Sequence, residues 1–123
     1  MRVMITGGAG FIGANLTNHL ELAGHEIVVF DDLSTGFERN LDGTAAELVV
    51  GSLLDPNAVQ SATESADAIV HLGALPSVPR SIGDPVASHM VNATGTVNVL
   101  EAARHDGGLH AASLMLCLVY VRL

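Results

Sequence analysis

A glycine-rich segment near the N-terminus constrains the fold of this chain more than any other feature. The segment Thr6-Gly7-Gly8-Ala9-Gly10-Phe11-Ile12-Gly13 directly follows the short apolar run Val3-Met4-Ile5. After it, apolar residues recur at helical spacing, and a glycine closes the pattern where a helix C-terminus favours one: Ile12, Leu16, Leu20, Ala23 and then Gly24. The pattern predicts a strand, a tight turn and a helix in succession.

The predicted turn has the features of an anion site. The first turn of a helix presents unpaired backbone N–H groups and the positive end of the helix dipole, and both favour a phosphate. Gly7 permits the tight turn, Gly10 lets the backbone approach a phosphate, and Gly13 lets the helix lie close to the strand. We therefore expect a dinucleotide pyrophosphate here. A glycine-rich turn that binds nothing is the alternative.

An acidic residue after the next apolar run supports the dinucleotide. The run Ile27-Val28-Val29-Phe30 ends in Asp31, 18 residues after Gly13, close to where this motif places an acid that binds the adenosine ribose hydroxyls. A carboxylate at this point would repel a 2′-phosphate. The sequence therefore predicts NAD rather than NADP as the cofactor.

Composition excludes several other classes of protein. The 123 residues fit one small domain, and 13 acidic against 5 basic residues (net charge −8) argue against nucleic acid or an anionic membrane as a partner. Cys117 is the only cysteine, and the six histidines show no metal-ligand spacing. No signal peptide is evident, and the apolar stretch 111–121 is shorter than the about 20 residues that cross a bilayer. We expect a cytoplasmic protein without a metal.

Strand and helix patterns alternate along the chain, which is typical of parallel strands joined by crossover helices. The predicted fold is α/β, a doubly wound parallel sheet of the Rossmann type in one incomplete domain, with strands at 2–6, 26–30, 47–50 and 67–72. Two helices are predicted to begin at Asp55-Pro56 and Asp84-Pro85, each with an N-cap carboxylate and a proline in its first turn. The second helix carries an apolar stripe that we expect to pack on the sheet: Val86, Met90, Ala93, Val97 and Leu100.

Four segments, taken in order, resemble the extended short-chain dehydrogenase/reductase family, in particular its NAD-dependent epimerases and dehydratases of the UDP-glucose 4-epimerase type. They are TGGAGFIG at 6–13, FDDLSTG at 30–36, HLGALPSVPRS at 71–81 and NATGTVNVLEAAR at 92–104. The combination is more specific than any single glycine motif. The resemblance implies an NAD-binding Rossmann domain, in partial form, at residues 1–106, followed by an atypical tail at 107–123.

The resemblance also implies a cofactor site. Asp31 and Asp32 would hold the adenosine, Thr35 and Gly36 its phosphate or ribose side, and Leu72 to Ala74 would lie under the nicotinamide half. For Asn92 a structural hydrogen bond is an equally good interpretation, and Ser77 is a candidate contact to a sugar nucleotide. Together with the glycines of the turn, the candidate cofactor-binding residues are Gly7, Gly10, Phe11, Ile12, Gly13, Asp31, Asp32, Thr35, Gly36, Ser52, Leu53, Leu72, Gly73, Ala74 and Asn92.

Two departures from the family pattern concern binding and catalysis. The family usually carries Gly-Asp where this chain has Gly51-Ser52, which we expect to cost about 1 kcal/mol of cofactor affinity. The family's catalytic Tyr-x-x-x-Lys pair is missing, because the chain contains no lysine and its only tyrosine is Tyr120. Ser113 precedes the apolar run at 114–121 instead of following it. No catalytic residue is therefore assigned, and we expect the chain alone to be inactive.

The tail admits two hypotheses. One is a frameshift or premature stop that truncates a longer epimerase. The other is a fifth strand at 114–121 that completes a minimal nucleotide-binding module, because without it the sheet would expose an apolar edge.

Two functions fit the sequence. The first is the NAD-binding portion of a nucleotide-sugar epimerase or dehydratase, a family that transiently oxidises a UDP-sugar with NAD. The second is a non-catalytic NAD-binding sensor or interaction module. An oligomer is compatible with both.

Overall fold

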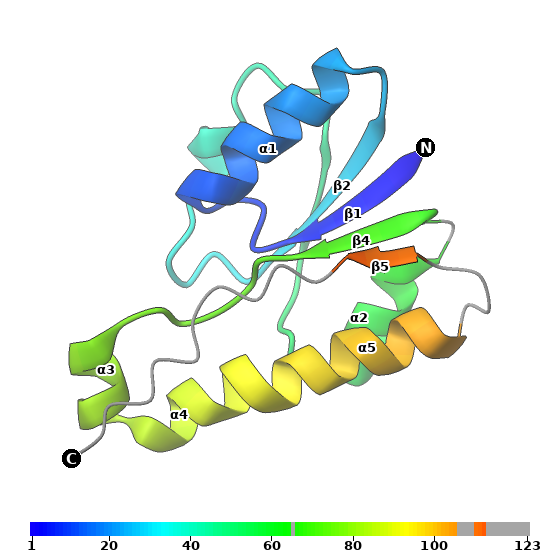
Figure 1. Cartoon of the computed structure of the whole chain (residues 1–123). Helices are drawn as coiled ribbons and strands as arrows, with labels where there is room; N and C mark the ends of the chain where they lie inside the picture. Colours follow the sequence, from blue (N-terminus) through cyan, green and yellow to red (C-terminus); the bar gives the residue numbers. More distant parts are fainter. Residues whose placement is uncertain (65, 106–109, 113–123) are drawn as a thin grey trace.

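A parallel β-sheet forms the centre of the computed structural model, which describes residues 1–64, 66–105 and 110–112 (Figure 1). Within this part of the chain the strands lie in the order β3-β2-β1-β4-β5. Their bounds are β1 (Arg2–Thr6), β2 (Glu26–Asp31), β3 (Glu47–Val50), β4 (Ala68–His71) and β5 (His110–Ala112). The chain continues from β1 to β2 on one side and later crosses to β4 on the other. The strand order therefore reverses between β1 and β4, which is the point where open α/β sheets bind ligands.

Helices cover both faces of the sheet, so the predicted doubly wound fold is confirmed. Figure 1 shows α1 (Phe11–Leu22) on one face, and α2 (Pro56–Thr63) and α5 (Gly95–His105) on the other. The 3₁₀ helix η1 (Glu38–Leu41) lies against α1. Two further helices and a π-helical turn lead into α5: α3 (Val78–Gly83), α4 (Pro85–His89) and η2 (Met90–Thr94).

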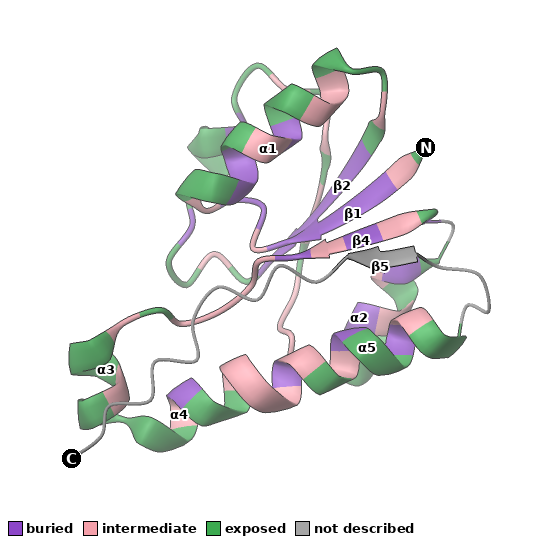
Figure 2. Cartoon of the chain, in the orientation of Figure 1, coloured by how far each residue is buried: buried purple, intermediate pink, exposed green. Residues whose placement is uncertain are grey.

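The core divides into two clusters because successive strand residues point to opposite faces of the sheet. Buried strand residues stand out in Figure 2. On the face of α2 and α5, the cluster contains Met4, Val28, Phe30, Val59, Ala66, Ile69, Val99 and Ala102. On the face of α1, it contains Val3, Ile5, Ala9, Ala14, Ile27, Val29 and Leu41. Both clusters thus draw on β1 and β2, whose residues alternate between the two faces.

Both predicted aspartate caps are confirmed. Asp55 Oδ1 accepts hydrogen bonds from the backbone N–H groups of Asn57 (3.0 Å) and Ala58 (3.1 Å) at the start of α2. Asp84 Oδ1 accepts one from Ala87 (3.0 Å) at the start of α4. Helix α3 lies between the strand predicted at 67–72 and the helix predicted to begin at Asp84-Pro85, where the sequence pattern predicted no helix. Its six residues are too few for a periodic apolar pattern, so sequence periodicity could not reveal it.

The prediction that the apolar stripe of the later helix packs on the sheet is wrong. Four of its members are exposed: Val86, Met90, Val97 and Leu100. The buried residues are instead Ser88, Gly95, Val99 and Ala102. Two causes are visible in the structure. The π-helical turn η2 changes the helical register between α4 and α5. Helix α5 also begins so close to the segment after β3 that only a small residue fits there, since a Cβ added to Gly95 would lie 2.9 Å from Leu53 Cβ.

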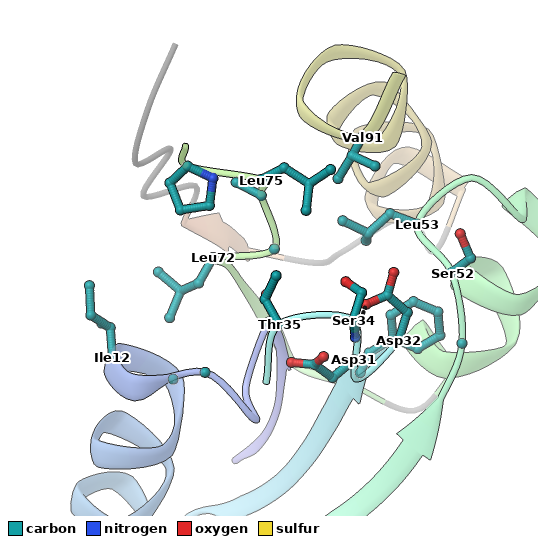
Figure 3. A pocket seen from close by; sticks show the side chains of 18 of the residues that line it. Ile12, Asp31, Asp32, Ser34, Thr35, Ser52, Leu53, Leu72, Leu75 and Val91 are labelled. Carbon is teal, nitrogen blue, oxygen red and sulfur yellow. Dashed lines mark hydrogen bonds between the residues drawn. The ribbon is translucent and has the colours of Figure 1, made fainter. Parts of the chain in front are cut away.

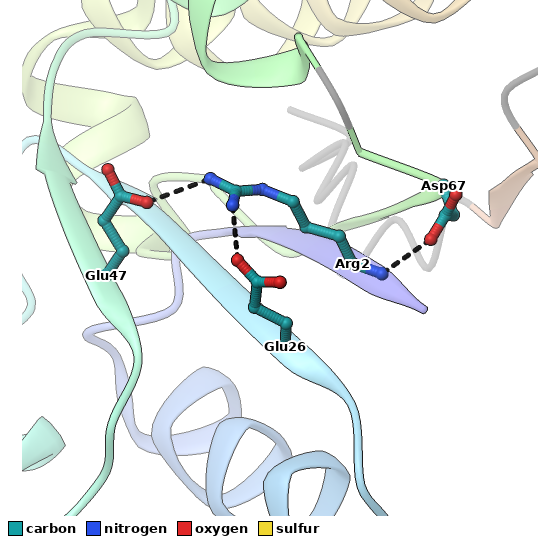
Figure 4. A network of polar contacts seen from close by, with 4 residues as sticks. All are labelled: Arg2, Glu26, Glu47 and Asp67. Carbon is teal, nitrogen blue, oxygen red and sulfur yellow. Dashed lines mark hydrogen bonds and ion pairs between the residues drawn. The ribbon is translucent and has the colours of Figure 1, made fainter.

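A charged network closes the amino end of the sheet (Figure 4). The guanidinium of Arg2 pairs with Glu26 of β2 and, at 2.9 Å, with Glu47 of β3. The backbone N–H of Arg2 donates to Asp67 Oδ2 at 2.7 Å, just before β4. This network therefore joins three neighbouring strands at the end of the sheet opposite to the glycine turn.

Several expectations concern residues outside the described part of the chain. These are the strand at 114–121 and the positions of Ser113, Cys117 and Tyr120. Within the tail, β5 pairs in parallel with β4, with Ile69 opposite Ala111. Among the described helices, none has the length and apolar character that crossing a bilayer requires.

Candidate functional site

A cavity of about 360 Å³ opens at the carboxyl ends of the strands, where the strand order reverses (Figure 3). Its volume is in the range of small-molecule and cofactor sites. Segments that follow β1, β2, β3 and β4 form most of its wall, and η2 contributes one side chain. The described residues that line it are Gly7, Gly10, Phe11, Ile12, Gly13, Phe30, Asp31, Asp32, Ser34, Thr35, Gly51, Ser52, Leu53, Leu72, Gly73, Ala74, Leu75, Pro76 and Val91.

The glycine turn has the geometry that its sequence predicts. Gly7 has a φ of +68°, a left-handed conformation that favours glycine. A Cβ on Gly13 would lie 2.4 Å from the carbonyl oxygen of Gly7, so only glycine lets α1 begin this close to the turn. Gly10 is the N-cap residue of α1, and no side chain caps this helix. The N–H groups of the first turn are thus left for an anion in the cavity.

Asp31 ties the turn to the loop after β2. Its side chain is buried, with Oδ2 accepting the backbone N–H of Ala9 (3.0 Å) and Oδ1 accepting that of Leu33 (2.9 Å). A carboxylate has about four lone-pair sites, so both oxygens keep acceptor capacity toward the cavity. Asp32 is exposed and accepts the N–H of Ser34 at 2.9 Å. Two carboxylates therefore stand side by side at the end of β2.

The loop after β4 is held by side chains from two other elements. The hydroxyl of Thr6, on β1, accepts the backbone N–H groups of Leu72 (3.2 Å) and Gly73 (3.1 Å). Asn92, on η2, accepts the N–H of Leu75 at 2.7 Å and donates to its carbonyl oxygen at 3.3 Å. Asn92 thus makes the structural hydrogen bond that the sequence left open, and it supports the cavity wall without lining it.

The structure brings most of the candidate cofactor-binding residues to one cavity. Those that do not line it are Gly36, Asn92 and the substrate candidate Ser77. Gly36 is buried against the glycine turn, where a Cβ would lie 2.8 Å from the carbonyl carbon of Ala9. Ser77 caps α3 by accepting the N–H of Arg80 at 3.3 Å. These contacts explain why each residue type suits its position.

Six lining residues were missed by sequence reasoning: Phe30, Ser34, Gly51, Leu75, Pro76 and Val91. Most are direct neighbours of assigned residues, so adjacency to Asp31, Ser52 and Ala74 was the available signal. Val91 directly precedes the assigned Asn92, and the fold brings η2, which carries both residues, to the cavity wall. No group of three or more His, Cys, Asp or Glu residues in the described part of the chain is arranged to hold a metal ion.

The parallel sheet, the glycine turn at the start of α1 and the acid at the end of β2 define a dinucleotide-binding α/β protein of the Rossmann class. Comparison with known proteins identifies the family. The chain belongs to the NAD dependent epimerase/dehydratase family, whose model matches residues 3–120.

Curated relatives agree with this assignment. A UDP-glucose 4-epimerase of Mycolicibacterium smegmatis is 40% identical over 112 residues, which cover 87% of this chain and 36% of that protein. A UDP-glucuronic acid decarboxylase 1 of Danio rerio is 34% identical over 110 residues, or 86% of this chain and 25% of that protein. The chain thus spans about a third of the length of the epimerase and a quarter of the decarboxylase.

Solved structures share the fold. The UDP-glucose 4-epimerase of Thermus thermophilus, determined in complex with NAD, superposes with a TM-score of 0.82 at 37% identity, covering 89% of this chain and 36% of that one. The enzyme of Thermotoga maritima, determined with UDP-glucose, gives a TM-score of 0.84 at 29% identity, covering 90% and 37%.

Proposed function

We propose that this chain binds NAD in the cavity at the carboxyl ends of its strands. The observation that carries the proposal is the convergence of the uncapped α1 N-terminus, the Asp31 carboxylate and the Leu72–Ala74 segment on one cavity. Membership of an NAD-dependent family and the NAD complex of the Thermus thermophilus relative support it. Residues 1–106 form the NAD-binding unit in this proposal.

Each part of the cofactor has a matching surface. The first turn of α1, which lines the cavity and has no side-chain cap, would hold the pyrophosphate through its backbone N–H groups. Asp31, Asp32 and Ser52 would hold the adenosine, and Leu72–Ala74 would hold the nicotinamide half. When bound, NAD supplies hydride acceptance. The residues of this chain bind and orient it.

Asp31 favours NAD over NADP. A 2′-phosphate near the adenosine ribose would meet the carboxylates of Asp31 and Asp32, and no lysine, arginine or histidine is among the described residues that line the cavity. Calorimetric titration with each cofactor tests this, with tighter binding of NAD expected. Absence of NAD binding, in calorimetry and in thermal protection, would refute the proposed function. Tighter binding of NADP would refute the preference alone.

The 123-residue chain holds the cofactor without performing the family's chemistry. It contains no lysine, so no Tyr-x-x-x-Lys pair is available to remove a proton from a sugar hydroxyl. Incubation with UDP-glucose and NAD is expected to yield no UDP-galactose above the protein-free control. Turnover above that control would overturn this part of the proposal. In full-length members, a nucleotide sugar is the partner that the cofactor oxidises and reduces.

A second candidate is a non-catalytic NAD-binding sensor or interaction module. The exposed apolar side chains of α4, η2 and α5 favour it, since four of them face solvent: Val86, Met90, Val97 and Leu100. Size-exclusion chromatography with and without NAD separates the two candidates. A change of oligomeric state on adding NAD supports the sensor or interaction module. An unchanged elution volume supports the first candidate, in which the chain binds NAD without changing its association.

A further inference from the structure

His71 connects three elements next to the cavity. It ends β4, directly before the segment that lines the cavity, and only 3% of it is exposed. Its Nδ1 lies 2.6 Å from Thr6 Oγ1 on β1, and its Nε2 lies 2.9 Å from Thr96 Oγ1 on α5. Both ring nitrogens are therefore engaged with hydroxyl groups.

The other partners of these hydroxyls fix the protonation state of the ring. The Thr96 hydroxyl donates to the carbonyl oxygen of Asn92 at 2.8 Å, so it accepts from His71, and Nε2 carries a proton. The two lone pairs of the Thr6 hydroxyl accept the N–H groups of Leu72 and Gly73, so its own proton is donated to Nδ1. His71 is thus neutral. Burial lowers the pKa of His71, which favours the same form.

A second proton on His71 would disturb this arrangement. Nδ1 would become a donor, and the Thr6 hydroxyl would have to accept three hydrogen bonds with two lone pairs. The N–H of Leu72 has another acceptor, the carbonyl oxygen of Thr6 at 3.1 Å, whereas Gly73 is held by the hydroxyl. Protonation of His71 therefore competes with the hydrogen bonds that the Leu72 and Gly73 N–H groups donate to this hydroxyl, and the competition matters more for Gly73 because Leu72 keeps its bond to the Thr6 carbonyl oxygen.

A shift of Gly73 would also move the glycine turn, because the two segments are in contact. The two backbones touch, since a Cβ on Gly7 would lie 2.8 Å from the Gly73 nitrogen. Both glycines line the cavity. The position of the loop and the shape of the pyrophosphate turn are thus linked through one contact.

In the part of the chain that the structure describes, no charged side chain forms an ion pair or hydrogen bond with the His71 ring. Asp31 ends β2 and Asp32 follows it, and β1 separates β2 from β4. Other charged residues of the described flanking elements occupy the amino end of the sheet or the later part of α5: Arg2 on β1, Asp67 before β4, and Glu101, Arg104 and His105 on α5. Burial and the two threonine hydroxyls therefore govern the titration of His71.

We propose that His71 is a positioning residue for the cofactor: its neutral Nε2–H form holds Gly73 in place, and protonation of His71 weakens NAD binding. The proposal rests on the NAD site argued above. It assigns to His71 a role in the shape of the cavity wall, and none in the chemistry of the family.

The first test uses the wild-type chain without cofactor. Nitrogen-15 NMR of the imidazole is expected to give the pattern of an Nε2–H tautomer near neutral pH. The Gly73 amide resonance is expected to shift with the same midpoint as the His71 ring. An Nδ1–H tautomer overturns the proposal whether or not NAD binds. So does a Gly73 amide resonance that does not shift as His71 titrates.

The second test measures the Kd of NAD by calorimetry from about pH 8 to about pH 5, a range that brackets histidine titration. The wild-type Kd is expected to rise about fivefold to tenfold at the acidic end, the factor that one hydrogen bond is worth. His71→Gln should bind more weakly at pH 8 and lose this pH dependence. His19→Gln, which alters an exposed histidine on α1, should follow the wild type.

The outcomes separate the two proposals. A pH profile of His71→Gln equal to that of the wild type overturns the role of His71. Absence of NAD binding at every pH overturns the proposed function, and the NMR test then decides the role of His71 alone. If His71→Gln does not fold, Thr6→Ser and Thr6→Val replace it. Thr6→Ser keeps the hydroxyl and the pH dependence, and Thr6→Val loses both.

Discussion

The carboxylate of Asp31 accepts a hydrogen bond from the backbone N–H of Ala9 at 3.0 Å, and this contact ties the end of β2 to the glycine turn after β1. The other carboxylate oxygen accepts the N–H of Leu33 at 2.9 Å. Asp31 therefore shapes the wall of the cavity independently of any ligand. Its substitution should affect the free protein as well as the binding of NAD.

Asp31→Asn is expected to lower the free energy of unfolding by about 1–3 kcal/mol, because an amide offers one oxygen and leaves one of the two N–H groups facing an NH₂ group. Urea denaturation without NAD measures this loss. Asp32→Asn is the matched control, since the exposed Asp32 accepts one N–H and an amide oxygen can replace it. A change within about 0.5 kcal/mol is expected there. Equal losses of stability in the two variants would contradict the conclusion that Asp31 holds the glycine turn and the loop after β2 in place.

Local signals made much of the fold and site predictable. The glycine turn, Asp31 and the two aspartate caps depend on a few neighbouring residues, and each lies where its pattern indicated. Val91 lines the cavity and Asn92 holds Leu75 because η2 packs against the loop after β4. No short sequence pattern encodes that packing.

Gly7→Ala is expected to lower the free energy of unfolding by more than the positive φ of Gly7 alone would cause. The φ of +68° and the Cβ position 2.8 Å from the Gly73 nitrogen add strain and a clash with backbone. Gly24→Ala provides the control, since Gly24 has a φ of +88° and nothing within 4 Å of an added Cβ. It should lose about 1 kcal/mol. A similar loss in both variants, measured by urea denaturation, would show that the contact between Gly7 and Gly73 is not tight.

The free energy of unfolding should depend on pH through His71. Burial lowers the pKa of His71 in the folded chain below its ordinary value of 6.5, so the unfolded chain binds more protons in the range between the two values. This contribution to stability is complete above about pH 6.5 and is lost as the pH falls toward the folded pKa. Urea titrations at a series of pH values measure it. His71→Gln should show a shallower acid loss, and an identical slope would contradict the argument.

The helix that contains the exposed stripe shows why an amphipathic pattern can mislead. The spacing of Val86, Met90, Val97 and Leu100 satisfies helical periodicity as well as the spacing of the buried residues does. Two facts outside the pattern select the face: the π-helical turn η2 and the close contact of Gly95 with Leu53. Large apolar residues could not replace the small ones at that contact.

Two valines on α5 test this choice of face. Val99 is 2% exposed and belongs to the core cluster with Met4 and Ile69, whereas Val97 is 55% exposed. Val99→Ala is expected to lower the free energy of unfolding by about 2 kcal/mol, since it removes buried apolar surface and leaves a cavity. Val97→Ala should stay within about 0.5 kcal/mol of the wild type. Because both changes remove the same two methyl groups from one helix, a larger loss for Val97→Ala in urea denaturation would mean that the predicted stripe, and not the observed face, packs on the sheet.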